Sequence, residues 1–342
     1  MMDYFFFIFC FLSIINLQIK GFDDFFFDYM RLDNTNSIKG LFVWLIIFRH
    51  KSTYRNYNKY LFKKIDNCLR QQIVSMFFFY SGYGIYESFK KKGKKYAKTL
   101  LLKGIKLFIK SQIIILIYLV TCIFIIKIKI TFKRYLLSVI FYSGLGNSNW
   151  FAFTIIMFYF YSFFSFGFIK YKFYYGIIII SFVCLLHSLI VYYYYFTKKK
   201  YAVDTILCFL FGFYYSYAQK YLDKIIMKND ICYFGIISIT IMIYYKFFEI
   251  KYLINECIKN ALFAIITVLI SMKVKFNNDL LKFLNLHSFS IYLLQRLVMM
   301  ITSYKNIFKD NNFIQLSLEF SSIFFIASLF DKYTTFIDNI LK

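Results

Sequence analysis

Residues 38–50 read IKGLFVWLIIFRH, an apolar run that begins with a lysine and ends with one of only three histidines in the chain. In a helix, Lys39 and His50 fall within roughly 20° of one face, about 16 Å apart along the axis. An ionisable side chain is costly in hydrocarbon, so we expect this face to line a cavity, a partner or a substrate path. The alternative is that His50 ends the helix and interacts with its last carbonyl groups.

The rest of the chain indicates a membrane protein. Of its 342 residues, 60% are hydrophobic, and the apolar runs recur from end to end without a polar block large enough for a soluble domain. Many runs approach the ~17–25 residues that cross hydrocarbon, where backbone groups must be satisfied internally. The alternation typical of an outer-membrane barrel is missing. The sequence therefore predicts an all-α, polytopic transmembrane helix bundle.

We expect about ten or eleven spans in this bundle. The segment 3–17 is a short span or an interfacial anchor, and the polar connection after it ends in DNTNS, which offers N-cap residues just before the run at 38–50. Residues 1–37 thus form an N-terminal hydrophobic segment with its connection, followed by a membrane-embedded domain over 38–335. The spans of that domain are expected at 38–50, 71–89, 107–127, 150–168, 173–195, 203–217, 231–247, 258–272, 285–303 and 312–330.

The charge of the chain indicates its orientation in the membrane. The formal net charge is +25, but the excess of Lys, Ile, Phe, Tyr and Asn and the absence of Pro are typical of an AT-rich genome. We therefore do not interpret the charge as nucleic-acid binding. Residues 90–110 carry nine lysines and no acid, which predicts that they and the Lys39 end are cytoplasmic and contact anionic lipid. The connection 51–70 and Lys198–Lys200 would then lie outside.

The cysteines do not indicate a metal site or a disulfide framework, because they are scattered singly without a CxxC pair or a histidine at ligand spacing. They are Cys10, Cys68, Cys122, Cys184, Cys208, Cys232 and Cys257.

Polar residues also interrupt the span at 71–89. In FYSGYGIYES, residues 79–88, the small residues Ser81, Gly82 and Gly84 permit close helix approach. Tyr83 and Glu87 lie one turn apart on one face. The alternative for Glu87 is that it reaches the membrane interface beside the lysines.

Two later segments carry further polar signals. GNSNW at 146–150 is a turn that leads into a span, although its tryptophan could instead belong to an interfacial aromatic belt. In LNLHSFSIYLLQR at 284–296, Gln295 and Arg296 lie inside an apolar run. Arg296 either snorkels to the interface or has a buried partner, for which Glu87 is a candidate. His187 and His287 are interpreted as structural or interfacial.

Five of these pieces, in order, resemble the acyltransferase 3 family, integral-membrane enzymes that acylate sugars, chiefly in bacterial surface polysaccharides. The pieces are Lys39-Gly40 with His50, IVSMFFFYSGYGI at 73–85, GNSNWF at 146–151, DTILCFLFGFYYS at 204–216 and HSFSIYLLQR at 287–296. In many members the first motif begins with Arg, and Lys39 keeps that charge without the bidentate fork. Gln295 stands where the late motif usually ends in His, which puts an acid-base role of that motif in question.

The resemblance implies transfer of an acyl group, most simply acetyl, from cytoplasmic acyl-CoA to a sugar hydroxyl, in a bacterial inner membrane. His50 would be the general base or a transient acyl carrier, and Lys39 would bind the CoA phosphates or the thioester carbonyl. The other residues expected to bind donor or substrate are Ser81, Tyr83, Glu87, Trp150 and Arg296. No bound cofactor or metal is expected; acetyl-CoA is a substrate, and the partners are acyl-CoA, a carbohydrate or glycolipid acceptor and membrane lipids.

Two competing interpretations remain. A transporter or flippase of lipid-linked sugars would also use many spans and buried ions, but it predicts inverted repeats and broken helices, and neither is visible in the sequence. A catalytically decayed family member would account for the departures at Lys39 and Gln295.

Overall fold

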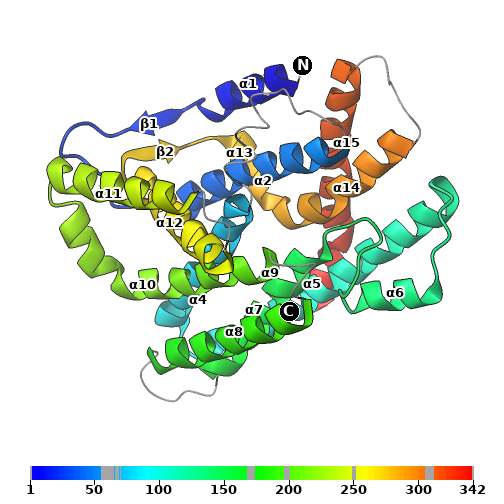
Figure 1. Ribbon diagram of the computed structural model, residues 1–342, viewed down its shortest axis with the longest axis horizontal. Helices are drawn as coiled ribbons and strands as arrows, with labels where there is room; N and C mark the ends of the chain where they lie inside the picture. Colours follow the sequence, from blue (N-terminus) through cyan, green and yellow to red (C-terminus); the bar gives the residue numbers. More distant parts are fainter. Residues whose placement is uncertain are drawn as a thin grey trace.

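The computed structural model describes residues 2–54, 65, 69, 71–167, 174–195, 201–248, 252–304 and 312–340. Most of these residues are helical, which confirms the all-α bundle (Figure 1). Most of the connection 51–70, including Cys68, and Lys198–Lys200 lie outside the described residues. The helices are α1 (Met2–Ser13), α2 (Leu32–Tyr54), α4 (Gln72–Lys92), α5 (Lys95–Val120), the π-helical turn η1 (Thr121–Ile125), α6 (Phe132–Val139), α7 (Asn149–Gly167), α8 (Tyr174–Tyr195), α9 (Tyr201–Asp204), α10 (Ile206–Ile226), α11 (Asp230–Phe248), α12 (Leu253–Lys273), α13 (Asp279–Leu286), α14 (Ser288–Tyr304) and α15 (Asn312–Ile340).

Within the described ranges, six helices are long and apolar enough to cross a membrane: α5 with η1, α7, α8, α11, α12 and α15. Large apolar side chains are exposed along α8 and α11, among them Phe182, Leu189, Phe234 and Met242, as expected for surfaces in contact with lipid. The protein is therefore a membrane-embedded helical bundle. Fewer helices qualify than the ten or eleven expected, because α2, α4 and α10 carry more polar residues and α14 has only 17 residues.

The N-terminal segment is shorter than expected. Helix α1 has 12 residues, which cover about 18 Å and fall short of the ~30 Å hydrocarbon core. Its side chains pack on the bundle, where the Phe9 ring stacks on Trp44 of α2 with centroids 4.2 Å apart. The geometry favours the anchor over the full span.

A small sheet follows α1 and was not predicted. Strand β1 (Leu17–Ile19) pairs antiparallel with β2 (Val274–Phe276), with Leu17 opposite Phe276. Next to it, the side chain of Asn278 caps α13 by accepting a hydrogen bond from the Leu281 amide at 3.1 Å. Its amide nitrogen also donates to the Leu12 carbonyl at 2.6 Å. The end of α1 is thereby fixed to the start of α13.

Helix α2 begins at Leu32, six residues before the apolar run, so the prediction of an N-cap in DNTNS is wrong. Asn34 donates to the Tyr29 carbonyl at 2.8 Å, and Ser37 donates to the Asp33 carbonyl at 3.3 Å. These side chains bond to carbonyls of the preceding turn instead of capping amides, which allows the helix to start earlier.

Gly40 in α2 is required by the close approach of α13. A Cβ atom added there would lie 1.9 Å from the Leu281 carbonyl oxygen. Likewise, a Cβ at Gly82 of α4 would lie 2.1 Å from the Phe209 carbonyl oxygen of α10. The predicted role of Gly82 in close helix approach is therefore confirmed. At Gly84 a Cβ would meet no atom within 4 Å.

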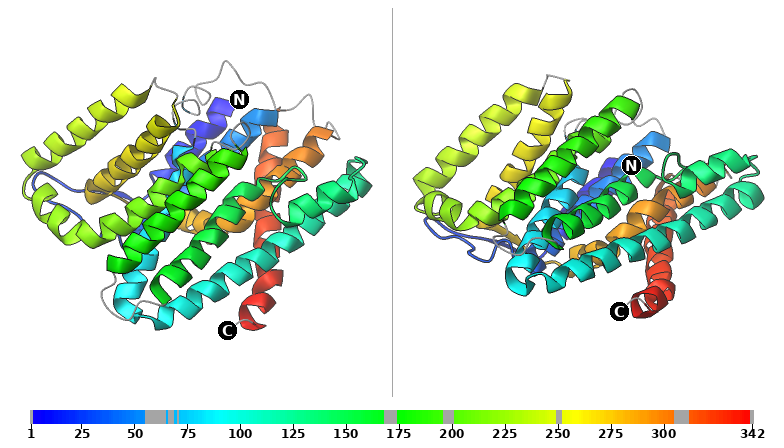
Figure 2. Two further views of the ribbon diagram at one scale, coloured as in Figure 1. Left: turned by 60° about the horizontal axis from the view of Figure 1, so that its bottom comes forward. Right: turned by 90° about the horizontal axis from the view of Figure 1, so that it is seen from below.

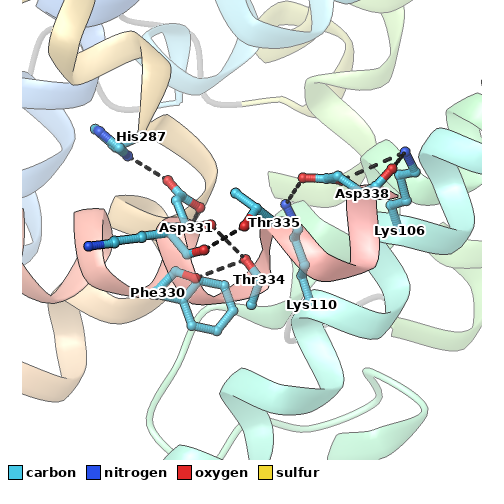
Figure 3. A network of polar contacts seen from close by, with 10 residues as sticks. Lys106, Lys110, His287, Phe330, Asp331, Thr334, Thr335 and Asp338 are labelled. Atoms are coloured by element: carbon cyan, nitrogen blue, oxygen red, sulfur yellow. Dashed lines mark hydrogen bonds and ion pairs between the residues drawn. The ribbon is translucent and has the colours of Figure 1, made fainter. Parts of the chain in front are cut away.

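Helix α15 packs beside α14 and α5 along one side of the bundle (Figure 2). Two of its carboxylates contact the neighbouring helices (Figure 3). Asp331 accepts a hydrogen bond from Ser290 Oγ at 2.5 Å and lies 2.6 Å from His287 Nδ1. Asp338 accepts one from Lys110 Nζ at 2.9 Å. The contacts of Asp331 fix the start of α14, which carries the late motif, and the contact of Asp338 joins α15 to α5.

Candidate active site

Two cavities follow one another along α2 and share Ile46 and Tyr292 in their walls. The first, which we name the Lys39 cavity, has a volume of about 430 Å³ and is lined by residues of α2, α4, α5, α7, α13 and α14. The second, the His50 cavity, has a volume of about 280 Å³. Its lining comes from α2, the start of α4, α14 and the turn that leads into α7.

The cavities lie toward opposite ends of the α2 and α4 pair. Along α4, Val74 lines the His50 cavity, whereas Ser88 lines the Lys39 cavity. A helix rises about 1.5 Å per residue, so these positions are about 21 Å apart. Along α2 the order is reversed, since Lys39 precedes His50.

The Lys39 cavity has largely apolar walls that include two lysines. The side chains of Val43, Phe77, Ile85 and Ile155 contribute to its wall. Besides Lys39 it contains Lys103 of α5, whose Nζ donates to the Tyr96 hydroxyl at 3.2 Å. Both Lys103 and Tyr96 belong to the lysine-rich start of α5. Ser81 of α4 also lines this cavity. Its composition is suited to a ligand with an apolar arm and an anionic end.

His50, Gln295 and Tyr292 lie where the two cavities meet. The His50 ring is 8% exposed, and its centroid lies 5.8 Å from that of Tyr292. The fully buried amide of Gln295 lies beside the imidazole and donates from Nε2 to the Tyr292 carbonyl at 3.2 Å. Gln295 lines the Lys39 cavity and His50 lines the other, so this pair of side chains spans the wall between them.

Gln295 and Tyr292 were not among the predicted site residues. The available signal was the segment HSFSIYLLQR, in which Gln295 stands where the family motif that it resembles has a histidine. The sequence could not show that this replacement lies beside His50, because α2 and α14 are far apart in the chain.

The His50 cavity differs from the first in having arginine instead of lysine side chains. Arg49 and Arg296 both line it, as do Trp150 and Asn149. Asn149 begins α7 and donates from Nδ2 to the Ser143 carbonyl at 2.8 Å, which holds the turn in place. Two predicted site residues, Trp150 and Arg296, are therefore brought into one cavity with His50.

Tyr83 and Glu87 line neither cavity. As predicted they share a face of α4, but that face packs on α10: Tyr83 donates to Gln219 at 2.8 Å, and Ser216 donates to Glu87 at 2.6 Å. Glu87 also pairs with Lys90 at 2.7 Å. The structure thus places these two residues in the interface of α4 and α10.

The expected pairing of Glu87 with Arg296 is wrong. Arg296 lines the cavity at the start of α4, whereas Glu87 lies near its end. Within the described residues no carboxylate forms an ion pair with Arg296, and its Nε is buried without a hydrogen-bond partner.

The other histidines contact single partners away from both cavities. His187 Nδ1 lies 2.7 Å from the Tyr161 hydroxyl, and His287 contacts Asp331. No three His, Cys, Asp or Glu side chains lie together as a metal site requires, in the part of the chain that the structure describes.

No family model, curated protein or solved structure matches the chain. The class is therefore defined by fold and site alone: a membrane-embedded helical bundle with two adjacent cavities that share Ile46 and Tyr292, one of which is lined by the buried His50.

Proposed function

We propose that this protein is an acyltransferase of a bacterial cytoplasmic membrane, which transfers an acyl group, most simply acetyl, from acyl-CoA in the Lys39 cavity to a sugar hydroxyl in the His50 cavity. The observation that supports the proposal is the meeting of the two cavities at His50, Gln295 and Tyr292. In this arrangement each substrate would occupy its own cavity, and the two would react next to the wall that the cavities share.

The Lys39 cavity fits an acyl-CoA by its charge and its walls. Lys39 and Lys103 are point charges that suit phosphate groups, and the lysine-rich ends of α4 and α5 increase the local concentration of an anionic donor. The apolar walls suit the acyl chain and the arm that carries it. Ser81 lies in the same wall.

In the reaction, the sugar hydroxyl oxygen attacks the thioester carbonyl carbon while His50 accepts the hydroxyl proton. The carbon–sulfur bond then breaks, and the proton passes from His50 to the departing thiolate, which leaves as free CoA. A positioned general base contributes about 10²–10⁴-fold to such a step. Gln295 would orient the imidazole from the donor side. In the alternative, His50 first takes the acyl group from the thioester and then gives it to the hydroxyl.

The positions of the motif residues in the structure support the same reaction. Lys39, His50, Ser81 and Trp150, which match positions in the motifs of the acyltransferase 3 family, all line one of the two cavities. Tyr83 and Glu87 do not, and we leave them out of the proposed site.

The test is transfer of label from radiolabelled acetyl-CoA into the glycan and glycolipid fraction of membranes that contain the protein. Wild type and His187→Ala, a matched control because His187 contacts Tyr161 outside both cavities, should transfer label. His50→Ala should be at least about 100-fold slower. Full transfer by His50→Ala would overturn the role of His50. Movement of a lipid-linked sugar across the membrane without any labelled product would favour the transporter.

A further inference from the structure

The cations of the His50 cavity indicate the chemistry of the acceptor. We infer that this cavity binds an acceptor that carries an oxyanion, a phosphate or a carboxylate, next to the hydroxyl that is acylated, with Arg296 as its main contact. That the ligand is an acyl acceptor rests on the proposed function, whereas the anion site itself can be tested without any acyl transfer.

The first argument is the charge of the lining. Arg49 and Arg296 both line a cavity of about 280 Å³, and among the residues that the structure describes none of its lining is an aspartate or a glutamate. Asp204 is close enough to Arg49 to interact with its charge, but it lies outside the cavity. The cavity therefore presents a concentrated positive charge.

The second argument is the state of Arg296. Within the described residues, no carboxylate pairs with it, and its Nε is buried without a hydrogen-bond partner. A guanidinium that is partly removed from water and unpaired is energetically costly. Its planar fork matches the two oxygens of a carboxylate or phosphate, so a bound oxyanion would satisfy both charge and hydrogen bonding.

The third argument is that the neighbouring amides are already engaged. Asn147 donates to Asn149, and Asn149 donates to the Ser143 carbonyl at 2.8 Å. The Asn147 side-chain oxygen accepts from the Leu145 amide at 3.1 Å. These side chains hold the turn, which makes the guanidinium of Arg296 the principal open donor for a ligand.

The size of the cavity limits what is bound. A volume of about 280 Å³ lies at the low end of the ~300–1,000 Å³ usual for small-molecule sites. It has room for one sugar-sized group, so the anion must belong to the sugar that is acylated or to its immediate linkage.

The experiment measures binding to the full-length purified protein in detergent, by the ligand-induced rise in unfolding temperature, without acyl donor. The probes are glucuronate, glucose 1-phosphate, the neutral methyl glucoside, and CoA. The variants are Arg296→Gln and Arg296→Lys, with Arg31→Gln as control because the Arg31 side chain is 71% exposed and pairs with Asp28.

We expect glucuronate or glucose 1-phosphate to stabilise wild type and Arg31→Gln, and methyl glucoside to have no comparable effect. Arg296→Gln should weaken anion binding at least about tenfold, and Arg296→Lys should restore it in part, because charge remains but the fork is lost. The stronger of the two anions identifies whether carboxylate or phosphate is preferred. CoA should bind equally to wild type and Arg296→Gln.

Three results would overturn the inference. The first is equal binding of the neutral and anionic sugars, and the second is unchanged anion binding by Arg296→Gln. The third is a loss of CoA affinity in Arg296→Gln as large as the loss for the sugars, which would assign the arginines to the donor.

The two proposals fail separately. Anion binding through Arg296 without any labelled transfer would contradict only the proposed function, and transfer to neutral sugars by Arg296→Gln would contradict only the anion site.

Discussion

The Lys39 cavity and the His50 cavity share a wall but differ in the cations that line them. The larger one, about 430 Å³, contains Lys39 and Lys103, whereas the smaller one, about 280 Å³, contains Arg49 and Arg296. Lysine is a mobile point charge, and arginine is a rigid fork. On our proposals, the lysines of the first cavity suit a long ligand with several phosphates, and the arginines of the second suit one oxyanion next to His50.

The two ends of α2 are also held in different ways. Near His50, Lys51 forms a buried ion pair with Glu319 of α15 at 2.5 Å, and Glu319 also accepts a hydrogen bond from Thr302 at 2.7 Å. Near Lys39, the helix is held by the close approach of Gly40 to the α13 backbone. A buried ion pair thus fixes the His50 end of α2, and close backbone packing fixes its Lys39 end.

The largest effect is expected from the buried ion pair. Glu319→Gln leaves the Lys51 ammonium uncompensated in a site where both side chains are at most 2% exposed, and breaking such a pair costs about 3–5 kcal/mol. We expect a large fall in unfolding temperature in detergent. The double variant Lys51→Met/Glu319→Met should recover most of the loss. A Glu319→Gln variant as stable as wild type would show that the pair does not hold this end.

The next largest loss of stability is expected at the Lys39 end of α2. In Gly40→Ala the added Cβ would lie 1.9 Å from the Leu281 carbonyl oxygen, so α2 and α13 must move apart, at a cost of about 1–3 kcal/mol. Gly235→Ala is the matched control, because a Cβ there meets no atom within 4 Å. Thermal unfolding should rank Gly40→Ala below wild type and Gly235→Ala at or above it. The opposite ranking would contradict the close packing of α13.

A kinetic prediction separates the cavities. Lys39→Ala should raise the KM for acetyl-CoA about tenfold, roughly 1.4 kcal/mol, with the acceptor KM unchanged, whereas Lys39→Arg should keep much of the activity. Arg296→Gln should do the reverse and raise the acceptor KM. If Lys39→Ala and Lys39→Arg are equally active, Lys39 does not contact the donor.

The smallest effect is expected at the polar connection between β1 and α2. Lys275 Nζ donates to Asp28 at 2.8 Å, and this hydrogen bond lowers the pKa of the Asp28 carboxyl below its ordinary value. The folded pKa is the lower one, so the contact stabilises the protein above the unfolded pKa of about 3.9. This stabilisation is lost as pH falls through the folded pKa.

For this partly exposed pair the gain is under about 1 kcal/mol. Lys275→Met should therefore lower the unfolding temperature slightly at pH 6 and flatten its fall between about pH 5 and 3. Identical pH profiles for wild type and Lys275→Met would exclude this contribution. Lys282→Met is a control, since Lys282 pairs with the exposed Asp279 instead.

Much of the helical architecture was predictable because it is encoded locally. Apolar runs such as 150–168 and 258–272 correspond closely to α7 (Asn149–Gly167) and α12 (Leu253–Lys273). The start of α2 and the strand pair β1–β2 were missed. Both depend on partners distant in the chain or on side-chain hydrogen bonds to carbonyls, neither of which leaves a periodic pattern.

The candidate site was predictable only in part. Lys39 and His50 line adjacent cavities, in agreement with the expectation that their helix face borders a cavity or a substrate path. The position of Gln295 beside His50 could not be anticipated, because it depends on how α14 packs against α2. The sequence also did not show that most of the length of α4 separates Glu87 from Arg296.

By itself, the sequence determined that the chain is a membrane-embedded helical protein and which residues carry charge within its apolar segments. Hydrophobicity and helical periodicity are properties of neighbouring residues, and each segment must satisfy its own backbone in hydrocarbon. Only the tertiary structure decided that two cavities adjoin along α2, that lysines line one and arginines the other, and that His50 lies near the wall that they share. Those features depend on which helix faces meet, and that choice follows from the packing of the whole bundle, with glycine contacts and buried ion pairs between residues far apart in the chain.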